Sequence, residues 1–275
     1  MSAFHFKRFS VVNEHSAMKV NTDGVLLGAV MTILPSDRRF LDIGTGTGTI
    51  ALMAAQRHSD IVNSLCSTGL ADLEGPVGTS EQSISPCSCS ASCAHWADAH
   101  VDAIDIDTPS IEEAAANFAN SPWPEVLSAH HASLDEFAEA SDSQYDLVFS
   151  NPPYFEDSLQ APEERRNAAR HTATGLSYRE IIDFAIQRLT PEGRLALVLP
   201  SDTELDLTRY ARMSGLHLYK MTRVRTVPRK APKRIIAEFS RKKTNIPEDK
   251  ILTIQDVGHY TQEYLTLMKD FYLFA

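Results

Sequence analysis

The sequence predicts an α/β fold in which a mostly parallel sheet carries one antiparallel hairpin at its edge. Short apolar runs alternate with helical patterns along most of the chain, which is typical of βα units. Near the end, two apolar runs at about His217–Val224 and Ile235–Ser240 follow one another with no helical pattern between them. Because parallel strands need a long crossover and antiparallel strands do not, these two runs predict the hairpin.

A chain of 275 residues can form one large α/β domain or two small ones, and we interpret residues 1–275 as a single domain. The hydrophobic content of 43% and the charged content of 23% are ordinary for such a domain. The chain has no apolar run of membrane-spanning length, and its first residues lack the apolar core of a signal peptide. We therefore expect no membrane contact and a cytoplasmic location.

The first elements surround a glycine-rich turn. Asp23 is a candidate N-cap for a helix in the segment Met18–Ala29, Phe40–Ile43 is the first strand of the sheet, and Thr49–Arg57 is the next helix. Between them, Asp42 precedes Gly44, Gly46 and Gly48, whose alternate spacing lets the backbone approach a ligand closely. The turn is typical of a nucleoside-cofactor loop, in which Asp42 favours a cationic group.

Residues from about 58 to 100 interrupt the pattern. This stretch is rich in Ser, Thr and Gly and holds all four cysteines of the chain, between Cys66 and Cys93. Helix-to-strand connections are usually a few residues long, so we interpret the stretch as a flexible insertion. The spacing Cys87-x-Cys89-x₃-Cys93 matches no common zinc site, and we expect no bound metal.

A second strand at Val101–Asp107 ends in acidic residues. In doubly wound folds an acid at this position accepts hydrogen bonds from the ribose hydroxyls of a bound nucleoside. Asp105 is the preferred candidate, and Asp107 is the alternative, although Asp107 or Thr108 also suits the N-cap of the helix that runs to about Asn120.

The remaining pattern completes the sheet. It predicts further strands and two helices, the first of which begins at a Ser-x-x-Glu capping box: strands Val126–His130, Tyr145–Ser150 and Arg194–Leu199, a helix from Ser177, and a short helix near Gln262–Asp270.

Asn151-Pro152-Pro153-Tyr154 follows the strand Tyr145–Ser150. The Asn151 side-chain oxygen and the Pro152 carbonyl can accept both N–H bonds of an adenine or amide amine. These dipoles aim the nitrogen lone pair outward and stabilise the positive charge that develops during alkylation. Tyr154 offers a face on which a flat group can stack.

These motifs together resemble the class I S-adenosylmethionine-dependent methyltransferases of the Asn-Pro-Pro-Tyr group. Further segments make the chain more similar to the bacterial tRNA1(Val) (adenine-37-N6)-methyltransferases: Phe6–Phe9, Ala17–Val20 with Thr22–Gly28, Asn151–Phe155, and the terminal Glu263-Tyr264 and Phe271–Phe274. The resemblance implies a Rossmann-like, seven-stranded class I methyltransferase fold, S-adenosyl-L-methionine as cofactor, and a flipped-out adenine as acceptor.

The resemblance also assigns the site residues. Catalytic roles fall on Asn151, Pro152 and Tyr154. Members of this methyltransferase group often place an acid after the third strand to contact the cofactor adenine, and here Ser133 stands there instead. The full set of expected cofactor contacts is Thr22, Asp23, Asp42, Gly44, Thr45, Gly46, Gly48, Asp105, Ile106, Ser133 and Asn151.

The basic residues Lys and Arg are absent from the middle part of the chain. The formal net charge is −10, yet no Lys or Arg occurs from His58 to Glu164, whereas ten occur from Lys220 to Lys243 beside one acid. A solvated hairpin surface would explain this density, but phosphate contact is the preferred interpretation. Candidate contacts with a tRNA anticodon arm are Lys7, Arg8, Arg165, Arg166, Arg170, Arg229, Lys230, Lys233 and Arg234.

Three other functions remain open at this point. One is glutamine N5 methylation of a release factor, whose enzymes share Asn-Pro-Pro-Tyr but carry a helical N-terminal substrate domain. About 35 residues precede the first sheet strand here, which disfavours this alternative. The others are a non-catalytic RNA-binding module, disfavoured by the intact motifs, and DNA adenine methylation. We expect no obligate protein partner.

Overall fold

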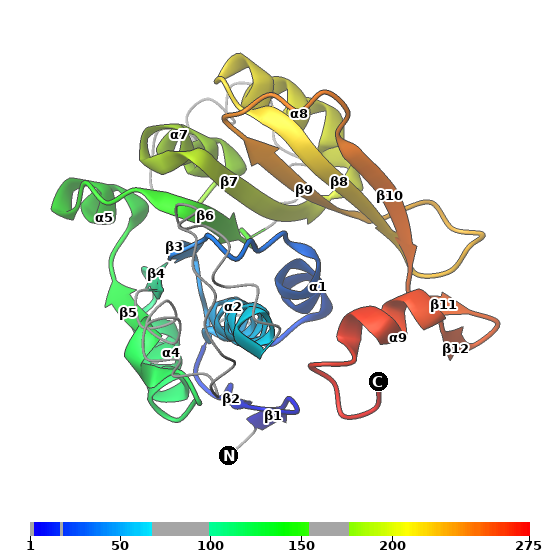
Figure 1. The fold of residues 1–275 in the computed structure, drawn as a ribbon, viewed down its shortest axis with the longest axis horizontal. Helices are drawn as coiled ribbons and strands as arrows, with labels where there is room; N and C mark the ends of the chain where they lie inside the picture. The colour runs from blue at the N-terminus through cyan, green and yellow to red at the C-terminus, as the bar shows by residue number, and fades with distance from the viewer. Residues whose placement is uncertain (1–2, 17–18, 68–98, 154–175) are drawn as a thin grey trace, which may run out of the picture.

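A twisted eight-stranded sheet forms the centre of the protein (Figure 1). The computed structural model describes residues 3–16, 19–67, 99–153 and 176–275. Within the sheet the strand order is β10-β8-β9-β7-β6-β3-β4-β5, and β9 alone runs antiparallel to its neighbours β7 and β8. The strands are β3 (Arg39–Ile43), β4 (His100–Asp105), β5 (Leu127–His131), β6 (Tyr145–Ser150), β7 (Leu189–Pro200), β8 (His217–Arg225), β9 (Arg234–Ser240) and β10 (Glu248–Thr253).

The architecture confirms the predicted α/β class and the antiparallel hairpin, formed by β8 and β9. The prediction of seven strands missed β10, which pairs parallel to β8 and adds an eighth strand at the edge. In β10 only Leu252 is buried, so this strand lacks the apolar run that marks a central strand.

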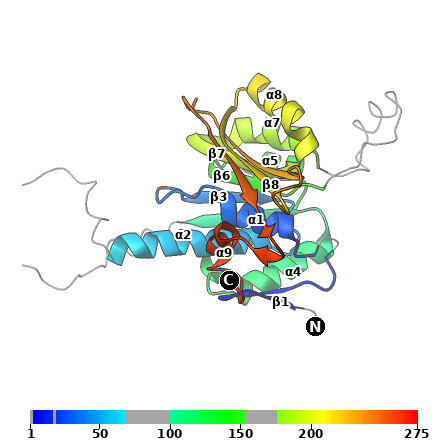
Figure 2. The ribbon, with the colours of Figure 1, turned by 90° about the vertical axis from the view of Figure 1, so that its right-hand side faces the viewer.

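Helices cover both faces of the sheet and make it a three-layer structure (Figure 2). One face carries α1 (Thr22–Val30), α2 (Thr49–Ser67) and α4 (Thr108–Ala119), and the other carries α5 (Leu134–Ala140), α7 (Tyr178–Arg188) and α8 (Glu204–Met213). Each face has its own buried apolar cluster. Helix α2 continues past the predicted end at Arg57, while residues 68–98 of the expected insertion lie outside the described residues.

Short elements complete the fold. The hairpins β1–β2 and β11–β12 and the helix α9 lie near the two chain ends, on the side of the sheet that carries α1 and α2 (Figure 2). None of the helices in the described ranges is long and apolar enough to cross a membrane. The short elements are β1 (Ala3–His5), β2 (Ser10–Val12), η2 (Pro124–Val126), η3 (Ser201–Thr203), β11 (Gln255–Asp256), β12 (His259–Tyr260) and α9 (Gln262–Met268).

Helix α1 is buried along most of its length, and two cations bind the carbonyls at its end. Lys220 Nζ donates to the Val30 carbonyl at 2.8 Å, and Arg57 donates to the Gly28 and Met31 carbonyls at 2.9 and 2.7 Å. Cations at a helix C-terminus complement the helix dipole, and here they satisfy carbonyls that the helix itself cannot. Lys220 also pairs with the buried Glu238 at 3.1 Å, which compensates its burial.

The N-cap of α1 is Asn21, and not Asp23 as the sequence suggested. Asn21 Oδ1 accepts a hydrogen bond from the Gly24 backbone N–H at 2.8 Å. Asp23 lies in the first turn of the helix, where its carboxylate accepts from Arg234 Nε at 2.7 Å. This ion pair joins the start of α1 to the start of β9.

The strand order reverses between β3 and β6, which lie side by side at the centre of the sheet. From β3 the chain continues outward through β4 and β5, and from β6 it continues outward through β7 in the opposite direction. The Ser150 hydroxyl, at the end of β6, donates to the Ile43 carbonyl at the end of β3 at 2.7 Å. Ligands of open α/β sheets bind at such a reversal point, outside the carboxyl ends of the strands.

Gly48 allows close packing of the glycine turn against α4. It has φ +80°, and a Cβ atom built on it would overlap the ring of the buried Phe118. We expect Gly48→Ala to lower the free energy of unfolding by about 2 kcal/mol or more, from overpacking and left-handed strain together. Gly215→Ala is the matched control, because Gly215 has φ +98° and open space around it. Urea unfolding of both variants tests this, and equal losses would contradict the packing role.

Candidate active site

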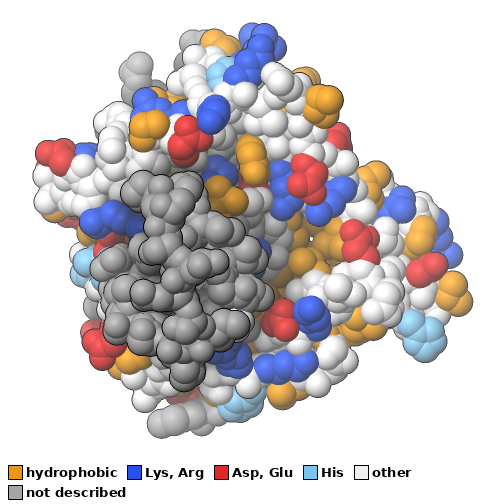
Figure 3. Space-filling model, viewed as in Figure 1, with side chains coloured by type: hydrophobic (Ala, Val, Ile, Leu, Met, Phe, Trp, Pro, Cys, Tyr) orange, Lys and Arg blue, Asp and Glu red, His pale blue; other side chains and the backbone are white. Residues whose placement is uncertain are grey.

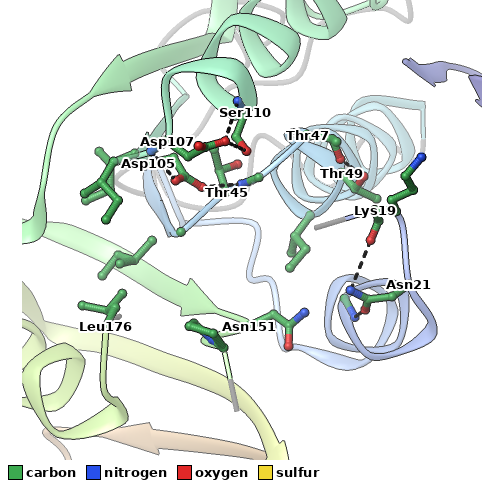
Figure 4. Close-up of a pocket in the computed structure, with 18 of the residues that line it drawn as sticks. Lys19, Asn21, Thr45, Thr47, Thr49, Asp105, Asp107, Ser110, Asn151 and Leu176 are labelled. Carbon is green, nitrogen blue, oxygen red and sulfur yellow. Dashed lines mark hydrogen bonds between the residues drawn. The ribbon is translucent and has the colours of Figure 1, made fainter. Parts of the chain in front are cut away.

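A cavity of about 270 Å³ lies at the carboxyl ends of β3, β4 and β6 (Figure 4). It brings together residues far apart in the sequence, with Asp105 and Asp107 on one side and Asn151 across from them. The site residues expected from the sequence that line it are Gly44, Thr45, Gly46, Asp105, Ile106 and Asn151, together with the alternative Asp107.

The glycine turn presents its backbone to this cavity. Gly44 and Gly46 have positive φ values of 70° and 56°, which glycine adopts without a steric penalty. The N–H groups of Gly44 and Thr45 donate to the Ile104 carbonyl at 2.9 and 3.0 Å, so the turn is fixed to the end of β4. No described atom lies within 4 Å of a Cβ built on Gly44, which leaves its backbone open to a ligand.

The Asp105 carboxylate joins the glycine turn to the segment that leads into α4. One carboxylate oxygen accepts from the Gly46 N–H at 2.8 Å, and the other accepts from the Asp107 N–H at 3.0 Å. Each carboxylate oxygen retains a further lone pair, so Asp105 can still accept hydrogen bonds from a ligand's hydroxyls. Asp107 accepts from the Ser110 N–H at 3.1 Å and its hydroxyl at 2.6 Å, and is the N-cap of α4.

Asp42 lies beneath the turn and not on the cavity wall. It is fully buried, and its Oδ2 accepts from the Thr45 hydroxyl at 2.7 Å. Burial raises the pKa of Asp42 to about 7. The expected direct contact between Asp42 and a cationic ligand group is therefore corrected, since the carboxyl supports the conformation of the turn from below.

Four other expected cofactor contacts also lie off the cavity wall. Ser133 is the N-cap of α5 in a capping box, where its hydroxyl and Glu136 bond reciprocally. Gly48 packs against Phe118, Thr22 is exposed in the first turn of α1, and Asp23 pairs with Arg234. The neighbours Ala132, Leu134, Asn21 and Gly24 line the cavity in their place.

Asn151 lies at the edge of the cavity at the end of β6. It is 9% exposed, and Pro153 also contributes to the wall. Pro152, the residue that follows Asn151, is buried. Tyr154, the third expected catalytic residue, lies outside the described residues. The structure therefore places the asparagine of the second motif at the same cavity as the glycine turn of the first.

The expected RNA contacts fall into two groups. Arg229, Lys230 and Lys233 are exposed on the loop between β8 and β9, and none forms an ion pair with an acid in the described ranges. We call residues 226–233 the basic loop. Arg234, at the start of β9, pairs with Pro200 at the end of β7 and with Val224 near the end of β8. The basic loop therefore lies at the same end of the sheet as the carboxyl ends of the parallel strands.

The other expected RNA contacts are engaged within the protein or undescribed. Lys7 Nζ donates to the carbonyls of Lys269 and Ala275 at 2.5 and 3.0 Å, which ties the two chain ends together. Arg8 pairs with Asp60 and lies over the Trp123 ring, 5.1 Å from its centroid. Arg234 pairs with Asp23, and Arg165, Arg166 and Arg170 lie outside the described residues.

Several wall residues were not predicted. The polar members are Lys19, Asn21, Thr47, Thr49 and Ser110, and the first four lie near the starts of α1 and α2 (Figure 4). Asn21 carried a signal in the sequence, because an asparagine three residues before a glycine at a helix start is a common N-cap. Lys19, Leu134 and Leu176 carried none, since only the fold brings their segments to the cavity.

Comparison with known proteins agrees with this geometry. Residues 30–230 match the family described as RMKL-like, methyltransferase domain. The chain is 37% identical over 271 residues to the tRNA1(Val) (adenine(37)-N6)-methyltransferase of Flavobacterium psychrophilum, covering 98% of this chain and 99% of that protein. The enzyme of the same name from Parabacteroides distasonis is also 37% identical, with 98% and 97% covered. The chain belongs to the tRNA1(Val) (adenine(37)-N6)-methyltransferase family.

Solved structures support the same fold at low sequence identity. A predicted O-methyltransferase from Agrobacterium tumefaciens superposes with a TM-score of 0.57 at 15% identity, covering 90% of this chain and 96% of that one. The Thermus thermophilus 16S rRNA N2 G1207 methyltransferase, solved with AdoMet and guanosine, gives 0.52 at 16% identity, with 88% and 50% covered. This member of the family therefore has the predicted class I methyltransferase fold.

Proposed function

We propose that this protein transfers a methyl group from S-adenosyl-L-methionine to the exocyclic N6 of adenine 37 in tRNA1(Val). The observation that carries the proposal is that the glycine turn, Asp105 and Asn151 line one cavity. A methyl donor held by the glycine turn and Asp105 would meet, inside this cavity, an acceptor amine held by Asn151. The curated relatives, which match along nearly their whole length, bear the name of this reaction.

The wall of the cavity fits a nucleoside sulfonium cofactor. The open backbone at Gly44 leaves room for close approach, and Asp105 retains acceptor capacity for ribose hydroxyls. Ile106, Leu134 and Leu176 add apolar surface to the cavity wall, as a flat adenine ring requires. When bound, S-adenosylmethionine supplies an electrophilic methyl group on its sulfonium.

Asn151 and Pro152 act on the acceptor amine through dipoles. The adenine amine is a weak nucleophile because its lone pair is delocalised into the ring. The Asn151 amide oxygen and the Pro152 carbonyl would accept its two N–H bonds, so that the lone pair points toward the cavity. The same dipoles stabilise the positive charge that develops on nitrogen, and no side chain with a tuned pKa is required.

The basic loop is our candidate for holding the anticodon arm of the tRNA. Its three exposed cations lie at the sheet edge where the cavity opens, and Ser201 N donates to the Lys233 carbonyl at 3.1 Å. The loop is therefore fixed to the end of β7, next to β6 and Asn151. Contacts with phosphates here would leave the flipped adenine within reach of the cavity.

Reversing the charge of the basic loop should weaken tRNA binding in a salt-dependent way. We expect the triple variant Arg229→Glu, Lys230→Glu and Lys233→Glu to bind about 10³-fold more weakly at low salt, since each lost phosphate contact also removes counterion release. The slope of log Kd against log salt should fall. Fluorescence anisotropy with labelled tRNA at several salt concentrations measures both.

The chain offers a matched control for this change. Arg241, Lys242 and Lys243 are also exposed and follow the other end of β9, at the opposite edge of the sheet. Reversing these three charges alters the net charge by the same amount. If both triple variants lose affinity equally, the basic loop is not the binding site.

An in vitro methylation assay tests the proposed reaction. The purified protein, labelled S-adenosylmethionine and a tRNA1(Val) transcript should give label in tRNA, and replacing adenine 37 by guanine should abolish it. A release-factor fragment containing a methylatable glutamine serves as the competing substrate. Label in the protein fragment alone would contradict our proposal and favour glutamine N5 methylation.

A further inference from the structure

A ladder of aromatic rings lies at the C-terminal end of the chain. Tyr260 packs against both Tyr264 and Phe274, with ring centroids 5.0 and 5.2 Å apart and interplanar angles of 25° and 13°. Phe274 also packs on Tyr272 at 4.9 Å. Although such rings are normally buried, Phe274 is 56% exposed and Tyr260 is 41% exposed. The protein therefore presents a preformed stack of rings to solvent.

The hairpin that carries Tyr260 also has a strained apolar tip. β11 and β12 pair through Asp256 and His259, and the two residues between them turn the chain. Val257 has φ +46° and is 89% exposed, and Gly258 has φ +81°. A β-branched residue in the left-handed region is a rare and costly conformation, and such residues concentrate at functional segments. The ring stack and the strained tip are two separate observations on one surface.

This surface lies next to the basic loop. The Ile254 and Gln255 N–H groups donate to the Arg225 and Thr226 carbonyls at 3.0 and 2.8 Å, so the segment leading into β11 is bonded to the start of the loop. The other end of the loop is bonded to Ser201 at the end of β7. The basic loop therefore connects the cavity edge on one side with the aromatic hairpin on the other (Figure 1).

Charge indicates which part of a nucleic acid the rings would contact. The exposed carboxylates Asp256 and Glu263 lie on the elements that carry Tyr260 and Tyr264 and would repel phosphates. Hydrophobic side chains in this part of the surface are interspersed with charges of both signs (Figure 3). Phosphates would therefore lie along the basic loop, and the rings would receive bases. Only unpaired bases expose a face that can stack on protein rings.

We propose that Tyr260 and Phe274 form a stacking surface for unpaired nucleotides of an RNA whose phosphates lie on the basic loop. The proposal rests on the proposed function, and it adds a second contact region that recognises a single-stranded loop in addition to the flipped adenine. Phe274 is the more exposed of the two rings, so a base would pack mainly on the part of this ring that is open to solvent.

Substitution of the exposed ring tests this assignment. Phe274→Ala should weaken tRNA binding about tenfold, as loss of one base–aromatic stack does. The slope of log Kd against log salt should stay unchanged, because no phosphate contact is lost. Leu205→Ala is the matched control and should bind like wild type, because this exposed apolar side chain lies on α8, on the opposite face of the sheet. Calorimetric titration with S-adenosylmethionine should give unchanged cofactor affinity in both variants.

Each alternative outcome has a definite meaning. If Phe274→Ala binds tRNA as tightly as wild type, the stacking surface is overturned. It is also overturned if the loss of tRNA affinity comes with a smaller slope of log Kd against log salt. In both cases, methylation of tRNA by the wild-type protein would still uphold the proposed function. A wild-type protein that neither binds nor methylates tRNA would overturn both. Wild-type dimers that Phe274→Ala converts to monomers in sedimentation would assign the rings to self-association and also overturn the proposal.

Discussion

Replacing Asn151 by alanine is expected to lower kcat roughly 10²-fold or more, while the affinity for S-adenosylmethionine stays near that of wild type. Asn151 lies across the cavity from Asp105, where it can contact an acceptor amine. Its loss therefore removes a dipole that is needed when positive charge develops on the amine. Single-turnover methylation, with cofactor binding measured separately by calorimetry, distinguishes these effects.

Two further variants sharpen this experiment. Asn151→Asp keeps an acceptor oxygen at the same position and should retain more activity than Asn151→Ala. Asn120→Ala removes an exposed amide at the end of α4, whose Nδ2 donates only to the Ala116 carbonyl at 2.8 Å among the described residues, and should leave kcat unchanged. Full activity in Asn151→Ala would dismiss the catalytic role of this residue.

Replacing Asp105 by asparagine is expected to weaken cofactor binding about 10- to 100-fold, because hydrogen bonds to a charged group contribute roughly 1.5–3 kcal/mol. The substitution also removes the carboxylate that accepts from the Gly46 and Asp107 N–H groups, so the glycine turn loses an anchor. Calorimetric titration of the purified variant with S-adenosylmethionine measures the change.

Asp107→Asn distinguishes the two acidic candidates. Asparagine is as good an N-cap as aspartate, so α4 should remain intact in this variant. If Asp105 binds the ribose, Asp107→Asn should bind the cofactor nearly as well as wild type. A larger loss in Asp107→Asn than in Asp105→Asn would transfer the ribose contact to Asp107.

The sequence predicted the parts of the fold whose signals are local. The β3 and β6 strands are buried apolar runs followed by glycine or proline turns, and both were located within one residue. Helix α8 was missed because only Leu207 and Ala211 are buried on it, which leaves too narrow an apolar stripe. Strand β10 was missed because its pairing with β8, and not its own composition, makes it a strand.

The site shows the same division between local and long-range information. Asp105 and the glycine turn were predicted together because each lies at the carboxyl end of its own strand, Asp105 in β4 and the turn after β3. Ser133 was assigned to the cofactor by its position after a strand, although Ser133-x-x-Glu136 is itself a capping-box signal. The pairing of Asp23 with Arg234 was not predictable, because these residues meet only when α1 packs beside β9.

Nucleoside mass spectrometry of tRNA from cells that lack this protein tests the central claim most directly. We expect N6-methyladenosine to disappear from tRNA1(Val) and to return when the wild-type protein, but not Asn151→Ala, is supplied. An unchanged content of N6-methyladenosine at position 37 would contradict the proposed reaction.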